Sequence, residues 1–185
     1  MSSKEPFEFN KDNIDIYLKD LSKEYRKKVG KNVLAEIILI GGASVLINYG
    51  FRNMTTDIDA IILASSTMKD VINIIGDKYN LPTGWLNQDF IKTDSYSPNL
   101  INYSDYYRTY SNVLTIRTIR AEYLISMKLK SGRQYKNDFS DIIGILSEYE
   151  NSENPITIDQ IKKMYLRDKH KNFIFYNKTE QNLYS

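Results

Sequence analysis

The chain has 185 residues, of which 42% are hydrophobic and 12% are aromatic, enough for one domain with its own core. Its formal net charge of +2 is too small to indicate a nucleic-acid-binding protein on charge alone. It contains no cysteine, which excludes disulfide bonds, thiol catalysis and zinc sites built from cysteine.

The first half of the chain alternates between helices and apolar strands. We expect residues 1–9 to be disordered or loosely attached, and their polar start shows no secretory signal. Hydrophobic spacing and glycine stops predict a helix around residues 14–25 that ends at Gly30, a strand over 33–40, a helix over 44–48 that ends at Gly50, a strand over 58–63 and a helix over 68–75 that ends at Gly76.

The second half is predicted to contain one clear strand and then helices. Strict alternation predicts a strand over residues 113–119, and Thr157 with Gln160 forms a capping box at a helix start. We further expect loop over 81–98, a short strand over 99–103, helices over 121–131 and 138–149, a linker over 151–155 and a last helix to about residue 170. No apolar run approaches the roughly 20 residues of a membrane span, so we expect a cytoplasmic protein without a membrane partner.

This order of elements predicts an α/β or α+β fold, with a small mixed sheet flanked by helices and a helical C-terminal part. The strands at 58–63 and 113–119 are expected on either side of the strand at 33–40. The predicted units are one domain over residues 1–150, with its core over 33–145, and a helical extension of that domain over 151–185.

Paired carboxylates are the strongest chemical signal in the sequence. Asp57 and Asp59 stand at the start of the strand predicted over 58–63, and residues two apart in a strand point to the same face. Two like charges that close repel each other, and a bound divalent cation relieves the repulsion. The alternative is a pair of solvated aspartates at a strand end, but acidic residues are depleted in strands. We therefore expect a metal site at Asp57 and Asp59.

A glycine turn precedes this pair and predicts a phosphate site. Gly41, Gly42 and Ser44 open the helix after the strand at 33–40, where backbone N–H groups bind phosphate and the serine hydroxyl adds a donor. The alternative is a tight strand-to-helix turn, because the third glycine of a dinucleotide fingerprint and the Gly-Lys-Ser/Thr end of a P-loop are both absent. A phosphate site beside paired carboxylates suggests metal-assisted phosphoryl or nucleotidyl transfer.

A third group of charged residues lies further along the chain, at Lys128, Arg133, Lys136, Asp138 and Asp141. Lys128 stands on an otherwise apolar helix, where its ammonium either reaches a nucleotide phosphate or extends to solvent. Asp138 and Asp141 begin the next helix, where the alternative role is that of an N-terminal charge and nothing more.

Three single residues complete the candidates. Arg52 precedes the paired aspartates, and we expect it either to pair with them or to contact phosphate. Trp85 lies in a loop rich in proline and glycine, where it either stacks on a base or, like most single tryptophans, belongs to the core. His170 stands late in a basic helix and is expected at the surface, so histidine-dependent hydrolysis has little support.

These groups together resemble the nucleotidyltransferase superfamily, which carries a Gly-Gly/Ser turn followed by Asp-x-Asp/Glu. The closer resemblance is to the AbiEii-type branch, the toxin half of certain bacterial toxin–antitoxin and abortive-infection systems. That branch reads approximately Gly-Gly-x-Ala-Leu, Gly-x-Arg and Thr/Ser-x-Asp-Ile-Asp, and this chain has Gly41-Gly42-Ala43-Ser44-Val45-Leu46, Gly50-Phe51-Arg52 and Thr55-Thr56-Asp57-Ile58-Asp59. The branch continues with a helix that carries Glu and Lys and then Arg-x-(Lys/Arg)-Asp-x-x-Asp-Ile, which is similar to Glu122, Lys128 and the segment from Arg133 to Ile142.

The resemblance implies a nucleotidyltransferase-like fold and a role for each motif. Asp57 and Asp59 would ligate Mg²⁺, as one ion or a two-ion site, and Gly41, Gly42 and Ser44 would hold the triphosphate of a nucleoside triphosphate. The resemblance also implies that Lys128 contacts phosphate and that an aspartate, Asp138 or Asp141, completes the catalytic site. The acceptor would be RNA (tRNA especially), protein or a small molecule, and an antitoxin protein would be the partner.

The chain also departs from the pattern of these families. Asn137 is an apparent insertion before Asp138, Ala43 stands where many members have Ser or Thr, and the strand at 113–119 carries no acidic residue. More typical nucleotidyltransferases place a third carboxylate on such a strand. These departures motivate an alternative function, a catalytically weakened member that binds nucleotide or a partner protein.

Overall fold

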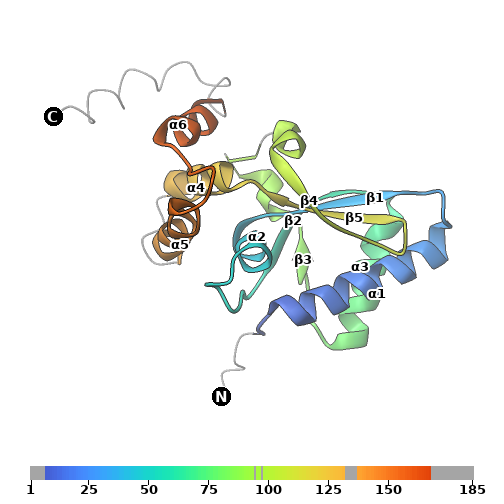
Figure 1. Ribbon diagram of the computed structural model, residues 1–185. Coiled ribbons are helices and arrows are strands. Elements are labelled where there is room, and N and C mark those ends of the chain that lie inside the picture. The colour runs from blue at the N-terminus through green and yellow to red at the C-terminus, as the bar shows by residue number, and fades with distance from the viewer. Residues whose placement is uncertain (1–6, 94, 97, 132–136, 168–185) are drawn as a thin grey trace.

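The computed structural model describes residues 7–93, 95–96, 98–131 and 137–167 (Figure 1). Its helices are α1 (Lys11–Val29), α2 (Gly41–Asn48), α3 (Thr67–Tyr79), α4 (Ala121–Ser131), α5 (Asp138–Glu150) and α6 (Ile158–Arg167), with two 3₁₀ helices, η1 (Asp89–Lys92) and η2 (Pro98–Tyr103). Its strands are β1 (Ala35–Leu39), β2 (Ile58–Leu63), β3 (Leu86–Asn87), β4 (Ser104–Tyr110) and β5 (Leu114–Ile119). Among the helices of these ranges, none combines the length and the apolar composition that crossing a bilayer requires.

The strands that the structure describes form one mixed sheet in the order β3-β2-β1-β5-β4. β1 lies at the centre, antiparallel to β2 and parallel to β5. At the edges, β3 pairs in parallel with β2, and β4 pairs antiparallel with β5. The mixed α/β sheet flanked by helices is therefore confirmed, and so is the central place of the first strand.

β1 is apolar on both faces, which explains its central position. Ile37 and Leu39 belong to one core with residues of α1 and α3, whereas Ile38 and Ile40 belong to a second core with residues of α4 and α5. Figure 1 shows α1 and α3 side by side, while α4, α5 and α6 gather at one end of the sheet. The sheet thus separates two cores, and the second core borders the candidate site.

A glycine after α1 and a capping box at the start of α6 form the helix ends that the sequence predicts. Gly30 follows the last residue of α1 at φ +85°, a conformation that favours glycine. At the start of α6 the Thr157 N–H donates to Gln160 Oε1 at 2.7 Å, and the Gln160 N–H donates to Thr157 Oγ1 at 3.2 Å. The predicted capping box is therefore present.

Residues 7–9 are not loosely attached, contrary to the expectation for the N-terminus. Phe9 is fully buried, and its backbone forms two hydrogen bonds with Thr55, of 2.7 and 2.8 Å. Phe7 packs against the same core. The sequence did not reveal that these two aromatic side chains join the core, because charged residues surround them. Residues 1–6 lie outside the described part of the chain.

Two predicted boundaries and one predicted stop were wrong. The first strand begins at Ala35, because Leu34 before it is 68% exposed. The helix predicted over 44–48 begins three residues earlier, at Gly41. Gly76 does not end its helix, which continues to Tyr79. It lets Trp85 approach instead, since an added Cβ would lie 3.4 Å from the indole.

The segment between α3 and β5 was predicted least well. Residues 99–103 belong to the 3₁₀ helix η2 and not to a strand, while β4 follows over 104–110, where no strand was expected. β4 is an edge strand that buries only Ser104 and Tyr110, so it lacks the apolar alternation that identifies a strand. β3 has two residues, too few to show any period.

Candidate functional site

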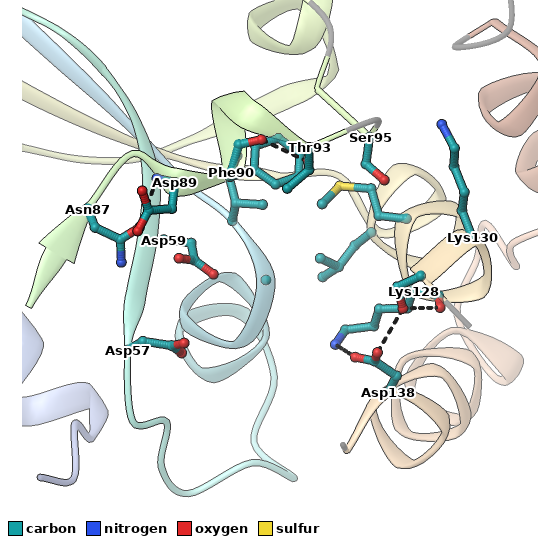
Figure 2. Close-up of a pocket in the computed structure, with 15 residues that line it drawn as sticks. Asp57, Asp59, Asn87, Asp89, Phe90, Thr93, Ser95, Lys128, Lys130 and Asp138 are labelled. Atoms are coloured by element: carbon teal, nitrogen blue, oxygen red, sulfur yellow. Dashed lines mark hydrogen bonds and ion pairs between the residues drawn. The ribbon is translucent and has the colours of Figure 1, made fainter. Parts of the chain in front are cut away.

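A cavity of about 560 Å³ lies between the β2–β3 edge of the sheet and helix α4 (Figure 2). Its floor is the end of β1 and the first residue of α2, Ile40 and Gly41. The segment after β3 adds Phe90, Thr93 and Ser95 to the lining. Four segments that are distant in sequence therefore meet around one space, whose volume is in the usual range for small-molecule sites.

Asp57 and Asp59 face this cavity together. The residues of β2 alternate between the two faces of the sheet, and Ile58 and Ala60 belong to the core beneath α1 and α3. Asp59 therefore points to the opposite face, Asp57 immediately precedes β2, and Figure 2 shows both carboxylates pointing into the cavity from the β2 side. The predicted same-face placement is present, while metal binding by this pair stays a prediction.

The backbone around the two carboxylates holds them in place. The Thr55 hydroxyl donates to the Asp57 carbonyl at 3.2 Å and to Asp57 Oδ1 at 3.4 Å. The Asp59 carbonyl accepts the Ile40 N–H at 2.9 Å, which ties the end of β1 to β2. An added Cβ on Gly41 would lie 3.6 Å from Asp59 Oδ2, so this carboxylate lies directly against the glycine.

The residues of the glycine turn have different environments. Gly41 lines the cavity at φ +56°, where a side chain would be strained. Gly42 lies behind it and is covered, since an added Cβ would be 2.6 Å from Thr55 Oγ1 and 2.9 Å from an Arg52 nitrogen. Ser44 is fully buried, and its hydroxyl donates to the Ile119 carbonyl at 3.5 Å. Gly41 thus lies at the cavity, as the predicted phosphate contact requires, whereas the Ser44 hydroxyl is directed to the Ile119 carbonyl; phosphate binding by this turn stays a prediction.

One face of α4 forms the opposite wall of the cavity. Leu124, Met127, Lys128 and Ser131 follow the three- and four-residue spacing of a helix face, and all of them line the cavity. The Lys128 side chain is only 9% exposed, so the ammonium does not extend to solvent. The helix therefore presents Lys128 to the space that the two aspartates face, and Lys130 of the same helix also lines the cavity.

Two carboxylates of α5 hold this lysine. Lys128 Nζ lies 2.8 Å from Asp138 Oδ1 and 2.8 Å from Asp141 Oδ2. Asp138 lines the cavity, and its Oδ2 accepts the Ser131 hydroxyl at 2.9 Å. Asp141 lies behind it, with a side chain that is 4% exposed. Of the two aspartates that the sequence left as alternatives, Asp138 is the one that faces the cavity.

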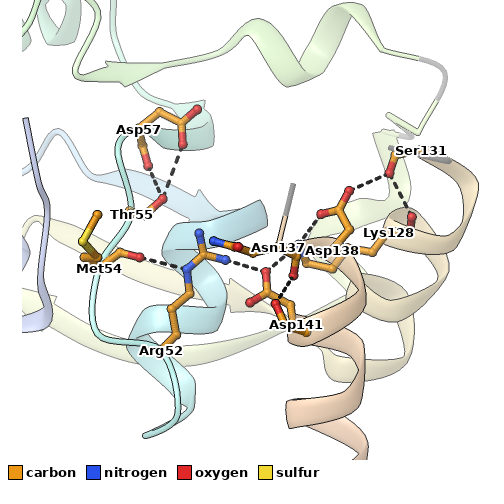
Figure 3. A network of polar contacts seen from close by, with 10 residues as sticks. Arg52, Met54, Thr55, Asp57, Lys128, Ser131, Asn137, Asp138 and Asp141 are labelled. Carbon is orange, nitrogen blue, oxygen red and sulfur yellow. Dashed lines mark hydrogen bonds and ion pairs between the residues drawn. The ribbon is translucent and has the colours of Figure 1, made fainter. Parts of the chain in front are cut away.

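Asp141 also binds a second cation (Figure 3). Arg52 NH1 donates to Asp141 Oδ2, and Arg52 Nε donates to the Met54 carbonyl at 2.9 Å. Arg52 therefore pairs with an aspartate of α5 and not with the two aspartates of β2. Together with Lys128 and Asp138, these side chains form a network of two cations and two carboxylates, which we call the α4–α5 network.

Sequence reasoning missed the contribution of β3 and η1 to the cavity. Asn87 is the register partner of Asp59 in the β2–β3 pair, and both Asn87 and Asp89 line the cavity. Asn87 Oδ1 accepts the Asp89 N–H at 3.0 Å, and Asp89 forms an ion pair with Lys92 at 2.7 Å. The Asn-x-Asp spacing was the available signal, but without a visible strand nothing placed it beside Asp59.

Of the remaining candidates, the structure describes only Trp85, which does not line the cavity. Trp85 is 3% exposed and its indole N–H donates to the Ile72 carbonyl at 3.1 Å, so it belongs to the core and does not stack on a base. Arg133, Lys136 and His170 lie outside the described residues.

The donor chemistry of the carboxylate pair fits a divalent cation. Carboxylate oxygens are ligands that Mg²⁺ prefers, and Mg²⁺ is commonly bound through one or two carboxylates together with substrate phosphates. Asp57 and Asp59 are the residues that would hold it. Within residues 7–93, 95–96, 98–131 and 137–167, no three His, Cys, Asp or Glu side chains gather closely enough to hold an ion, so the pair has no third carboxylate partner there.

The mixed sheet thus sets two aspartates beside the start of the glycine-led helix α2. The model of a family described as "nucleotidyltransferase of unknown function (DUF6036)" matches residues 16–183, and the chain belongs to this family. The chain is also similar to the crystal structure of an antigenic nucleotidyltransferase-like protein from Paracoccidioides brasiliensis, with a TM-score of 0.47 and 11% identity over 90% of this chain and 91% of that one. No curated protein matches the sequence. The family match confirms the predicted resemblance to nucleotidyltransferases at the level of the family.

Proposed function

We propose that the protein is an Mg²⁺-dependent nucleotidyltransferase that moves a nucleotide from a nucleoside triphosphate to an acceptor hydroxyl. The observation that carries this proposal is the single cavity shared by Asp57, Asp59, Gly41 and Lys128. It combines two carboxylates for a cation, a helix start for phosphate oxygens and the ammonium of Lys128 for further phosphate charge.

Each side of the cavity has its own task in this proposal. When bound by Asp57 and Asp59, Mg²⁺ supplies charge neutralisation at the transferring phosphoryl group and aligns the nucleophile with the leaving group. The backbone N–H groups beside Gly41 and the ammonium of Lys128 bind phosphate oxygens from two sides. The acceptor oxygen bonds to the α-phosphorus, the bond from that phosphorus to the bridging oxygen breaks, pyrophosphate leaves with the electron pair, and the hydroxyl proton passes to water.

A labelling assay tests the proposal. The wild-type protein, Asp57→Ala and the control Asp70→Ala are incubated with Mg²⁺, each of the four α-labelled nucleoside triphosphates and total cellular RNA, protein or an aminoglycoside. Asp70 is an exposed aspartate of α3, so its removal controls for a general loss of negative charge. We expect labelled acceptor with wild type and Asp70→Ala and none with Asp57→Ala. Equal labelling by all three, or none with any nucleotide and acceptor, would reject nucleotidyl transfer.

The missing third carboxylate favours a second candidate, a family member that binds nucleotide without turnover. β5 (Leu114–Ile119) carries no acidic residue, and this is the strand on which the resemblance to more typical nucleotidyltransferases would place a third carboxylate. Calorimetry with ATP, CTP, GTP and UTP, with and without Mg²⁺, separates the two candidates. Metal-dependent binding without transfer supports the second candidate, and absence of binding contradicts both.

The AbiEii-type resemblance of the glycine and aspartate motifs extends the proposal to the toxin of a toxin–antitoxin system. In that role the acceptor is RNA, tRNA in the first place, and an antitoxin protein suppresses the transfer. Expression of the chain would arrest bacterial growth, and Asp57→Ala would restore it. Normal growth with the wild-type chain would remove the toxin role while leaving nucleotidyl transfer to be judged by the labelling assay.

A further inference from the structure

We propose that Asp138 is a displaceable counter-ion of Lys128, which a phosphate group of the substrate must replace before the lysine binds it. The inference deepens the proposed function and rests on it only for the identity of the anion as a polyphosphate. The geometry of the α4–α5 network carries the argument.

The charges around Lys128 are already balanced within the network. Its ammonium lies 2.8 Å from a carboxylate oxygen of Asp138 and 2.8 Å from one of Asp141, while Arg52 pairs with Asp141 as well. Among the described residues of the network, two cations therefore face two carboxylates. A polyphosphate that enters the cavity meets a lysine without surplus positive charge and a cavity-lining carboxylate that repels it.

The two carboxylates differ in how easily they can be exchanged. Asp141 is 4% exposed and shared by Arg52 and Lys128, which are 16% and 9% exposed, so its loss would leave two partly buried cations short of a partner. Asp138 is 16% exposed and lines the cavity. Its second oxygen accepts the Ser131 hydroxyl, a contact that can persist when Lys128 turns away.

Exchange of one acceptor for another keeps the lysine satisfied. A lysine ammonium has three N–H donors and no acceptor, and Lys128 donates to Asp138 Oδ1 while it forms an ion pair with Asp141. A phosphate oxygen that takes the place of Asp138 leaves the contact to Asp141 intact. Figure 2 shows Lys128 and Asp138 meeting at the cavity wall opposite the carboxylates of β2, where this exchange would occur.

Titration of the full-length protein with inorganic tripolyphosphate in EDTA tests the inference by calorimetry. Asp138→Asn removes the competing charge and keeps the side-chain shape, and we expect it to bind tripolyphosphate about tenfold more tightly than wild type, a conservative value for one like charge a few ångströms away. Asp89→Asn is the matched control, because Asp89 is another cavity-lining aspartate, which the structure pairs with Lys92. We expect the control to change the affinity by less than about threefold, since an exposed charge is screened by solvent and salt.

Each result decides the inference. Tighter binding by Asp138→Asn that is lost again in the double variant Asp138→Asn/Lys128→Met supports it. Equal tightening by Asp138→Asn and Asp89→Asn would indicate a general charge effect and overturn it, as would unchanged or weaker binding by Asp138→Asn in a variant whose thermal unfolding matches wild type. The titration needs neither metal nor turnover, so a negative labelling assay rejects the proposed function and leaves this test valid.

Discussion

Asp20 and Asp141 each form ion pairs with two cationic side chains, and the solvent exposure of those cations differs. Asp20, on α1, binds Lys23 of its own helix and Lys78 of α3, and the hydroxyl of Tyr79 donates to it as well. The ammonium-bearing side chains there are 59% and 54% exposed. The cations that Asp141 binds are 9% and 16% exposed and lie beside the candidate site.

This difference indicates what each aspartate contributes. Exposed ion pairs add little stability, because solvent and salt screen them and long side chains lose entropy when they are held. A buried cation whose carboxylate is removed is costly, because nothing replaces the lost hydration. Asp20 should therefore affect only the packing of α1 on α3, whereas Asp141 should affect both stability and the position of Lys128 in the cavity.

Substitution of the carboxylates of β2 should give the largest effect. Asp57→Asn or Asp59→Asn keeps the side-chain shape and removes the charge that would hold Mg²⁺, and we expect a loss of roughly 100-fold or more in transfer rate, as for single electrostatic groups in other enzymes. Asp20→Asn should transfer at the wild-type rate. Single-turnover labelling measures all three, and a similar loss in Asp20→Asn would show that activity follows stability and not the site.

Removal of the carboxylate shared in the α4–α5 network tests whether Asp141 contributes more to stability than Asp20. Asp141→Asn leaves Arg52 and Lys128 without their shared carboxylate, and we expect it to lower the free energy of unfolding by about 3 kcal/mol. Asp20→Asn should lower it by about 1 kcal/mol, the value for well-formed exposed pairs. Urea unfolding followed by circular dichroism measures both, and equal losses would contradict the difference in burial.

Gly42→Ala tests the same network through Arg52, the cation that pairs with Asp141. An added Cβ would lie 2.6 Å from Thr55 Oγ1 and 2.9 Å from an Arg52 nitrogen, so the guanidinium must move from its place beside Asp141. We expect a loss of about 2 kcal/mol, typical of overpacking. Gly50→Ala, where an added Cβ meets nothing within 4 Å, is the control and should be nearly neutral. Wild-type stability of Gly42→Ala would show that Arg52 is free to shift.

The smallest effect concerns the pH dependence of the Asp20 contacts. The hydrogen bond from Lys78, followed by those from Tyr79 and Lys23, holds the pKa of Asp20 well below its usual range. The resulting stability is present above the unfolded-state pKa of about 4 and is lost as the pH falls through the folded-state pKa. The difference in unfolding free energy between wild type and Asp20→Asn should therefore shrink between about pH 5 and pH 2. A difference that stays constant over this range would contradict the assigned cause.

The predictable parts of the fold are those with a local signal. Alternation identified β5, apolar runs identified β1 and β2, and the two-residue spacing of Asp57 and Asp59 placed them on one face. β4 was not predicted, because an edge strand with a mostly exposed surface has no apolar period. The burial of Phe9 was not predicted, because it depends on a β-bridge to Thr55, which is far along the chain.

The residues of the site divide in the same way, into those with a local sequence signal and those placed by long-range packing. Lys128 was a candidate because a lysine on an apolar helix is unusual, but its partners depend on how α5 packs on α4. The pair of Arg52 and Asp141 joins residues 89 positions apart, and no spacing rule connects them. Asn87 reaches Asp59 only through the parallel pairing of β3 with β2, which depends on the sheet as a whole.

The central claim is that Asp57 and Asp59 hold one divalent cation in the cavity that Lys128 faces. Crystals grown with Mn²⁺ and a non-hydrolysable nucleoside triphosphate test it through anomalous scattering. We expect an anomalous peak for Mn²⁺ within coordination distance of oxygens of both aspartates, with phosphate oxygens of the analogue on its open side. A peak bonded to other residues, or none between the two carboxylates at saturating Mn²⁺, would contradict it.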